Sequence, residues 1–220
     1  MAAGIDTITV TMTVGTADAQ DSRVDPDREI VENARIGNTD AFETLVLRHQ
    51  SHIVNYAAAV MRDSNDAEDV AQQTFLRAYR ALAQFRGEST FKTWLYRIAT
   101  NVALTHLNRR DRETRMRNHN LDDDTSSLKA FEIASQGIDT ETNVVLRDTI
   151  DRALATLPNE LRIAVILRDV AGLDYKEIAD ATGAPIGTVE SRIFRGRQRL
   201  RPLLRPPTTP QSRNEAKDDV

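Results

Sequence analysis

Residues 174–197 read DYKEIADATGAPIGTVESRIFRGR, and this stretch decides how the rest of the chain is interpreted. Asp174 followed three residues later by Glu177 has the pattern of a capping box, in which each side chain accepts a hydrogen bond from the other residue's backbone N–H. Gly183 suits a tight turn that needs a positive φ, and Pro185, which has no N–H, suits the start of another helix. The stretch therefore predicts two short helices joined by a tight turn.

The pattern within this helix pair indicates what the second helix can do. Tyr175, Ile178 and Ala179 can face Val189 and Ile193 across the bend, which leaves the outer face of the second helix available. A helix presented in this way fits the major groove of DNA. The alternative is an ordinary helical hairpin that packs on a core.

The charge of the chain is segregated. Its net charge is −4, yet residues 188–205 hold six arginines against one glutamate, whereas residues 1–30 hold six acidic residues against two arginines. A local basic patch matters more for phosphate contact than the total charge does. The second helix of the pair therefore remains a candidate DNA-binding element.

Composition excludes several other classes of protein. The chain contains no cysteine, so disulfides, thiolate metal sites and thiol nucleophiles are excluded. No apolar run approaches the roughly 20 residues that a membrane span needs, so we expect a cytoplasmic protein without membrane insertion. His49 and His52 are close in sequence but have no third ligand at metal spacing. We therefore expect no metal, no cofactor and no catalytic residues.

Helical periodicity divides the chain. Apolar residues recur at helical spacing over residues 27–112 and again over 141–204, with no strand required, so we predict an all-α fold of two small helical domains. Residues 113–140 lose the periodicity and are predicted to be a flexible linker. Residues 1–26 and 205–220 are predicted to be disordered tails.

Two separated stretches resemble one family. The sequences EDVAQQTFLRAY at 68–79, FRG at 85–87 and TWLYRIATN at 93–101 resemble the second conserved region of bacterial sigma factors. The helix pair, preceded by Leu157-Pro158 and Leu167-Arg168, resembles their fourth region. The presence of only these two regions resembles the extracytoplasmic-function branch. The resemblance implies an alternative sigma factor that binds core RNA polymerase and directs promoter-specific initiation, while catalysis resides in the core enzyme.

The resemblance also implies partners. The face formed by Asp69, Gln72, Gln73 and Arg77 would dock on the clamp helices of the largest polymerase subunit, although an acidic residue is usual at the position of Gln73. The flap of the second-largest subunit and an anti-sigma factor are the other protein partners implied. For each of these residues alone, a solvated helix face is the simpler interpretation.

The helix predicted to follow residue 90, together with the loop at residues 85–90 before it, resembles the part of the family that melts and reads the −10 promoter element. Unpaired bases need stacking partners and cationic cover for the backbone. Asn101 resembles the pocket residue that receives a base turned out of the stack, and periodicity places Trp94 at least partly in the core. The implied −10 residues are Phe91, Lys92, Trp94, Arg97, Asn101, Arg109 and Arg110, with Tyr96 as a further aromatic candidate.

The second helix of the pair matches the part of the family that reads the −35 element. Glu190 stands where family members commonly have Arg or Lys, and an acid there can accept from cytosine N4, whereas arginine pairs with guanine. Arg192, Arg197 and Arg199 are expected to anchor phosphates. The other implied −35 residues are Lys176, Thr188, Ser191, Phe194 and Arg195. A helix-turn-helix regulator that does not replace the sigma subunit is the alternative function, but it leaves the motif at residues 68–101 unexplained.

Overall fold

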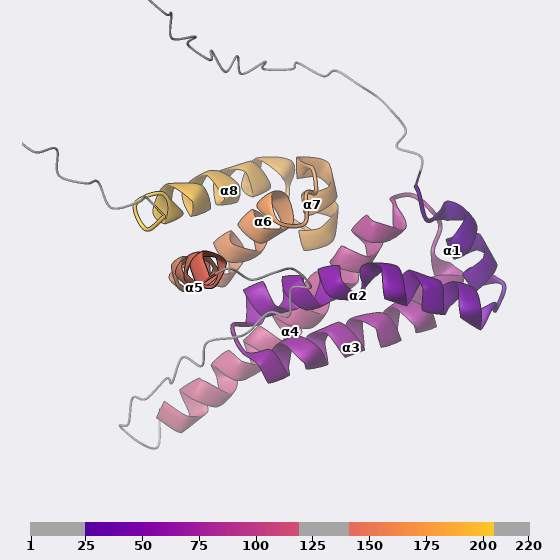
Figure 1. Ribbon diagram of the computed structural model, residues 1–220, viewed down its shortest axis with the longest axis horizontal. Helices are drawn as coiled ribbons and strands as arrows, with labels where there is room; N and C mark the ends of the chain where they lie inside the picture. The colour runs from indigo at the N-terminus through magenta and orange to yellow at the C-terminus, as the bar shows by residue number, and fades with distance from the viewer. Residues whose placement is uncertain (1–24, 119–140, 205–220) are drawn as a thin grey trace, which may run out of the picture.

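A computed structural model describes residues 25–118 and 141–204 (Figure 1). Within these ranges every regular element is helical, which confirms the predicted all-α class. The predicted tails, apart from residues 25 and 26, and residues 119–140 of the predicted linker lie outside the described residues. The elements are α1 (Arg28–Arg35), α2 (Thr39–Met61), α3 (Ser64–Ala81), the 3-10 turn η1 (Leu82–Gln84), α4 (Phe91–Asn118), α5 (Glu141–Ala155), α6 (Asn159–Asp169), α7 (Tyr175–Thr182) and α8 (Ile186–Leu200).

Helices α1 to α4 form the first unit. α3 packs against both α2 and α4, and α1 lies against α2 (Figure 1). The core between these helices is apolar, with Leu45, Ile53, Val70, Leu95 and Val102 at most 1% exposed. α4 continues to Asn118, so a polar, arginine-rich sequence extends the helix beyond the apolar stripe and into the first residues of the predicted linker.

Helices α5 to α8 form the second unit, in which α6 and α8 make the most intimate contact. Gly196 of α8 is buried against α6, and a Cβ built on it would lie 2.5 Å from Val165 Cγ2 and 3.4 Å from the backbone oxygen of Leu161. A glycine at this position therefore allows the two helices to approach closely.

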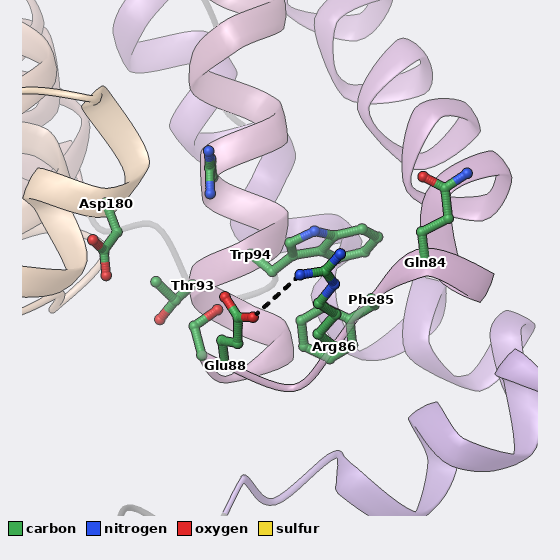
Figure 2. Close-up of a pocket in the computed structure, with 9 residues that line it drawn as sticks. Gln84, Phe85, Arg86, Glu88, Thr93, Trp94 and Asp180 are labelled. Atoms are coloured by element: carbon green, nitrogen blue, oxygen red, sulfur yellow. Dashed lines mark ion pairs between the residues drawn. The ribbon is translucent and has the colours of Figure 1, made fainter.

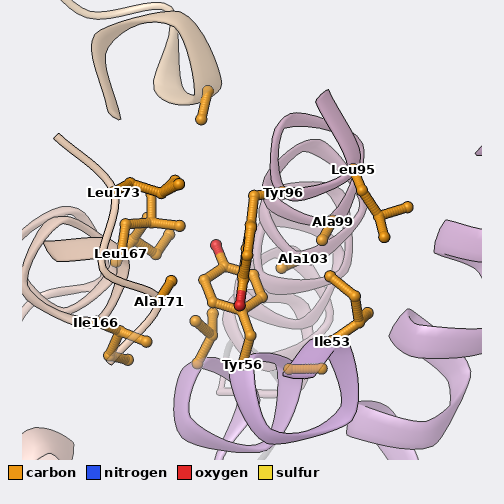
Figure 3. Packing of buried hydrophobic residues seen from close by; sticks show 14 of the residues in the cluster. Ile53, Tyr56, Leu95, Tyr96, Ala99, Ala103, Ile166, Leu167, Ala171 and Leu173 are labelled. Carbon is orange, nitrogen blue, oxygen red and sulfur yellow. The ribbon is translucent and has the colours of Figure 1, made fainter. Parts of the chain in front are cut away.

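The two units pack against each other along a seam made by α2 and α4 on one side and α6 and α7 on the other. Figure 3 shows Tyr56 and Tyr96 of the first unit facing Leu167, Ala171 and Leu173 of the second. The rings of the two tyrosines meet edge to face at 5.3 Å. Burial raises the pKa of Tyr96 to about 12. The buried residues of both units thus form one continuous core.

A hydrogen bond also joins the two units between the C-terminal ends of α2 and α5. The guanidinium of Arg62, which follows α2, donates to the backbone oxygen of Ala155 at the end of α5 over 2.7 Å. Arg62 has a positive φ of 62°. None of the described helices combines the length and the apolar character needed to cross a membrane.

Candidate nucleic-acid interfaces

The predicted helix pair folds as a helix-turn-helix. Asp174 Oδ1 accepts from the N–H of Glu177 and Glu177 Oε2 accepts from the N–H of Asp174, both over 2.8 Å, so the capping box is confirmed. Gly183 ends α7 with a φ of 66°. Val189 and Ile193 face inward and are at most 2% exposed. The opposite face of α8 is therefore directed to solvent.

The outer face of α8 carries the predicted −35 residues. Glu190, Phe194 and Arg195 are exposed, and Phe194 retains 68% of its surface, which is unusual for a large apolar ring. Ser191 is partly buried and donates its hydroxyl to the backbone oxygen of Thr188 over 2.9 Å. Lys176 and Arg199 are exposed at either end of the motif. The outer face of α8 thus leaves Glu190, Phe194 and Arg195 accessible, as a groove-binding helix requires.

Two of the predicted phosphate anchors are held by carboxylates of α6. Arg192 donates to Glu160 over 2.7 Å, and Arg197 donates two hydrogen bonds to Asp169, one of them over 3.1 Å. The hydrogen bond to Asp169 raises the pKa of Arg197. These ion pairs orient both guanidinium groups along the edge of α8.

A pocket of about 420 Å³ opens beside the first turns of α4 (Figure 2). The rings of Phe85 and Trp94 lie 4.9 Å apart at its wall, and an ion pair of 3.9 Å joins Arg86 to Glu88 at its mouth. The pocket combines an aromatic wall with charged and hydroxyl groups. Its lining residues are Gln84, Phe85, Arg86, Glu88, Ser89, Thr93, Trp94, Arg97 and Asp180.

Of the predicted −10 residues, Trp94 and Arg97 line this pocket. Trp94 is partly buried, as its periodicity indicates, and Arg97 is exposed. The sequence interpretation assigned the loop at residues 85–90 to the −10 region but named none of its residues as a contact, so Arg86, Glu88 and Ser89 were missed, together with Gln84 of η1. The signal that could have found them is the cluster of polar residues in this short loop immediately before an aromatic helix start.

The prediction that Phe91 contacts DNA was wrong. Phe91 is 0% exposed, and its ring lies among His49, Phe85 and Trp94 at centroid distances of 5.4, 6.4 and 5.8 Å. The reason is positional, because the first residue of α4 shares the apolar stripe that faces the bundle. Tyr96 is also buried, against Tyr56, and offers no exposed ring to a base.

The remaining predicted −10 residues lie outside the pocket. Asn101 is exposed further along α4 and is not among the lining residues. Arg109 pairs with Glu113 and Arg110 with Asp66, at 3.3 and 3.2 Å. The structure therefore distributes the predicted cations along α4 rather than around one site.

The N-terminal end of α4 meets the second unit at the seam. Lys92 Nζ donates to the backbone oxygen of Ala171 over 2.7 Å, and the Thr93 hydroxyl donates to Glu177 Oε1 over 2.6 Å. Glu177 thus contributes to the capping box of α7 and to the seam at once. Asp180, from α7, completes the rim of the pocket.

The predicted polymerase-binding residues share an open face of α3. Asp69, Gln72 and Arg77 are exposed and Gln73 is partly exposed. Leu76 and Tyr79 on the same helix are 49% and 52% exposed, and sequence periodicity alone does not identify them as accessible. This helix face combines polar and apolar groups, as protein-binding surfaces often do.

Comparisons with known proteins match this architecture. Residues 45–113 match the model of Sigma-70 region 2, and residues 147–200 match that of Sigma-70, region 4. The chain belongs to the sigma-70 family, in its extracytoplasmic-function (ECF) branch. It is an alternative sigma factor for transcription initiation.

The sequence alignments with curated relatives cover nearly the whole length of those relatives. The RNA polymerase sigma-H factor of Pseudomonas aeruginosa is 41% identical over 189 residues, and the ECF RNA polymerase sigma-E factor of Escherichia coli strain K12 is 39% identical over 189 residues. Each alignment covers 81% of this chain and 96% of the relative.

Solved structures share the fold. CnrH, solved in complex with the cytosolic domain of CnrY, is 27% identical with a TM-score of 0.57, over 81% of this chain and 96% of that one. The sigma factor RpoE of Bartonella quintana, solved with the anti-sigma factor NepR, is 26% identical with a TM-score of 0.59, over 74% and 96%.

Proposed function

We propose that this sigma factor contacts its promoter at two elements. In this proposal α8 enters the major groove of the −35 element, and the pocket beside α4 binds a base of the melted −10 element. The observation that carries the proposal is that one chain presents both an exposed helix-turn-helix and, on its other unit, a pocket with an aromatic wall. Aromatic stacking is worth about 1–3 kcal/mol per base. The catalytic step of RNA synthesis belongs to core polymerase.

Three protein partners fit the proposal. The face of α3 with Asp69, Gln72, Gln73 and Arg77 would dock on the clamp helices of the largest polymerase subunit. The second unit would contact the flap of the second-largest subunit. An anti-sigma factor is proposed as the third partner, because two structural neighbours were solved in complexes, one with the cytosolic domain of CnrY and the other with the anti-sigma factor NepR.

The direct experiment combines the purified chain with core polymerase and maps transcription starts on fragmented genomic DNA. We expect starts that share one −35 and one −10 sequence and that are absent with core polymerase alone. A folded chain that binds DNA without binding core polymerase would favour the helix-turn-helix regulator instead.

Glu190 provides the test of the −35 contact. Glu190→Arg should shift the preferred −35 base from cytosine, whose N4 amino group can donate to a carboxylate, to guanine, which pairs with arginine. Each good pairing contributes roughly 1–3 kcal/mol of discrimination. Affinity for core polymerase should stay unchanged. Asp148→Arg, on α5, changes the net charge equally outside the helix-turn-helix and serves as the control. An unchanged −35 preference in Glu190→Arg would remove Glu190 from the readout.

Trp94 and Arg97 provide the test of the pocket. Trp94→Ala should reduce permanganate reactivity of unpaired thymines at −10 by about tenfold, given the stacking energy above. Arg97→Ala should also reduce it, because it removes a cation that can cover the DNA backbone. Binding of the −35 duplex and of core polymerase should be retained. Arg35→Ala, an exposed change on α1, is the matched control. Normal strand opening in both pocket variants would refute the assignment.

A further inference from the structure

The start of α4 is capped by a carboxylate from a distant part of the chain. Thr90 accepts the N–H of Thr93 on its hydroxyl over 3.2 Å and the N–H of Trp94 on its backbone oxygen over 3.0 Å. The backbone N–H of Phe91 instead donates to Asp25 Oδ2 over 2.6 Å, although the two residues are 66 positions apart in the sequence. A negative charge at a helix N-terminus is favourable, because the first N–H groups lack partners within the helix.

Asp25 is itself fixed by its neighbour Asp27. Asp25 Oδ1 accepts from the N–H of Asp27 over 3.0 Å. Asp27 is only 1% exposed, and its carboxylate lies between Arg48 and His49 of α2. The distance between Asp27 Oδ2 and His49 Nε2 is 2.7 Å. A buried carboxylate is costly unless it is paired and hydrogen-bonded. Its partners on α2 therefore hold the segment 25–27 in place.

Both carboxylates act on Phe91. Asp25 holds its backbone N–H, and Asp27 holds the His49 ring, whose centroid lies 5.4 Å from the Phe91 ring. The centroid of the Phe91 ring also lies 6.4 Å from that of Phe85 and 5.8 Å from that of Trp94. Those two rings are the aromatic wall of the pocket in Figure 2. Phe91 thus connects the segment 25–27 to the pocket without entering it.

We propose that Asp25 and Asp27 are positioning residues for the pocket: acting through Phe91, they set the placement of Phe85 and Trp94 that receives a −10 base. This inference rests on the proposed function of the pocket. Binding sites need their contact groups held to about 0.5 Å by surrounding residues, and a ring that is buried and held at both its backbone and its face supplies that support.

A competing role for Asp25 predicts the opposite effect. Helix N-termini bind phosphate, so a carboxylate there could exclude a DNA phosphate from α4. Removing Asp25 would then strengthen −10 binding, whereas removing a positioning residue weakens it. The sign of the change separates the two roles.

The test compares Asp25→Ala with Asp25→Asn in the full chain bound to core polymerase. Asparagine keeps an oxygen that can accept the Phe91 N–H, whereas alanine removes it. Strand opening is followed by the fluorescence of 2-aminopurine at the −10 position of a promoter found by start-site mapping. We expect Asp25→Ala to reduce opening about threefold to thirtyfold, the range for lost helix caps, and Asp25→Asn to stay within about twofold of wild type. Glu29→Gln, an exposed acid of α1, controls for charge.

A combination with the pocket variant separates positioning from general destabilisation. If Asp25 acts through the pocket, Asp25→Ala combined with Trp94→Ala should open DNA no worse than Trp94→Ala alone, since residues acting as one unit are non-additive. Core affinity and −35 affinity should be unchanged in Asp25→Ala when measured at a temperature at which this variant, which loses a helix cap, is still fully folded. Additive losses, a parallel fall in core affinity, wild-type opening or stronger −10 binding would each overturn the proposal.

The same variants distinguish failure of this inference from failure of the proposed function. Normal opening in Trp94→Ala would mean that the pocket does not receive a base, and the inference would fall with it. Impaired opening in Trp94→Ala with normal opening in Asp25→Ala would overturn only the role of Asp25. Asp27→Asn replaces one of the two oxygens that bond to Arg48 and His49 with an NH2 group, so it should reduce opening as Asp25→Ala does. Normal opening in this variant would contradict the proposed role of the Asp27 hydrogen bonds.

Discussion

Because Gly196 packs closely against α6, we expect Gly196→Ala to destabilise the protein, although helix propensity alone predicts that it stabilises. Replacing glycine by alanine inside a helix normally stabilises by up to about 1 kcal/mol. The Cβ of Gly196→Ala would lie 2.5 Å from Val165 Cγ2, far inside van der Waals contact, and 3.4 Å from the backbone oxygen of Leu161. Overpacking typically costs about 1–3 kcal/mol, and so close a contact belongs in the upper part of that range. We expect a net loss of about 1–2 kcal/mol.

Gly187 supplies the matched control within the same helix. A Cβ at Gly187 would meet no atom within 4 Å, and its φ is not in the left-handed region. Gly187→Ala should therefore gain up to about 1 kcal/mol. Urea denaturation followed by circular dichroism would measure both changes, and binding of −35 duplex DNA would show whether a shifted α8 still reads the groove.

A double-mutant cycle tests whether the contact with Val165 Cγ2 causes the loss of stability in Gly196→Ala. Val165→Ala removes the methyl group that the new Cβ meets, so it should recover part of the loss in Gly196→Ala, with a coupling energy of about 0.5–3 kcal/mol. A Gly196→Ala protein as stable as wild type, or losses that simply add in the double variant, would refute the reasoning from this contact.

Three further predictions concern the capping box, the buried tyrosine and the seam. Asp174→Ala should lower the free energy of unfolding by about 0.5–2 kcal/mol, while Asp174→Asn should lose much less; equal melting temperatures for the two variants would contradict the capping role. Burial raises the pKa of Tyr96 to about 12 from an ordinary 10.0, so the unfolded chain releases that proton first and stability should fall as pH rises from 10 to 12. Tyr96→Phe should lack this part of the alkaline loss, and a wild-type slope in that variant would count against the assignment. Leu173→Ala should loosen the seam, which small-angle X-ray scattering would detect as a larger radius of gyration, and should strengthen binding of −10 single-stranded DNA; no change in either would show that Leu173 does not hold the units together.

Local sequence signals predicted the parts of the structure that depend on neighbouring residues. Asp174, Glu177 and Gly183 specify their caps and turn within a few positions of the chain, and the structure confirms all three. Phe91 was misassigned because aromatic chemistry suggested a base contact, while its place at the start of the apolar stripe of α4 directs it inward. Periodicity, weighed alone, would have given the right answer.

Long-range contacts had no comparable signal. The hydrogen bond from Phe91 to Asp25 and the bond from Thr93 to Glu177 join residues 66 and 84 positions apart. Nothing in the neighbourhood of Asp25 distinguishes a distant helix cap from the other acidic residues of the first thirty. The closed seam likewise depends on how two helical units meet, which the pattern within each unit does not specify.

The seam affects how tightly the chain can appear to bind any partner that needs its units apart. In the closed form Lys92 and Thr93 are engaged by the second unit, so such a partner meets only the open fraction of molecules. Its apparent dissociation constant is the intrinsic value divided by that fraction. If one molecule in about a hundred is open, binding weakens about a hundredfold, equivalent to roughly 2.7 kcal/mol. A single stronger or weaker contact at the seam can therefore tune promoter occupancy without altering any residue that touches DNA.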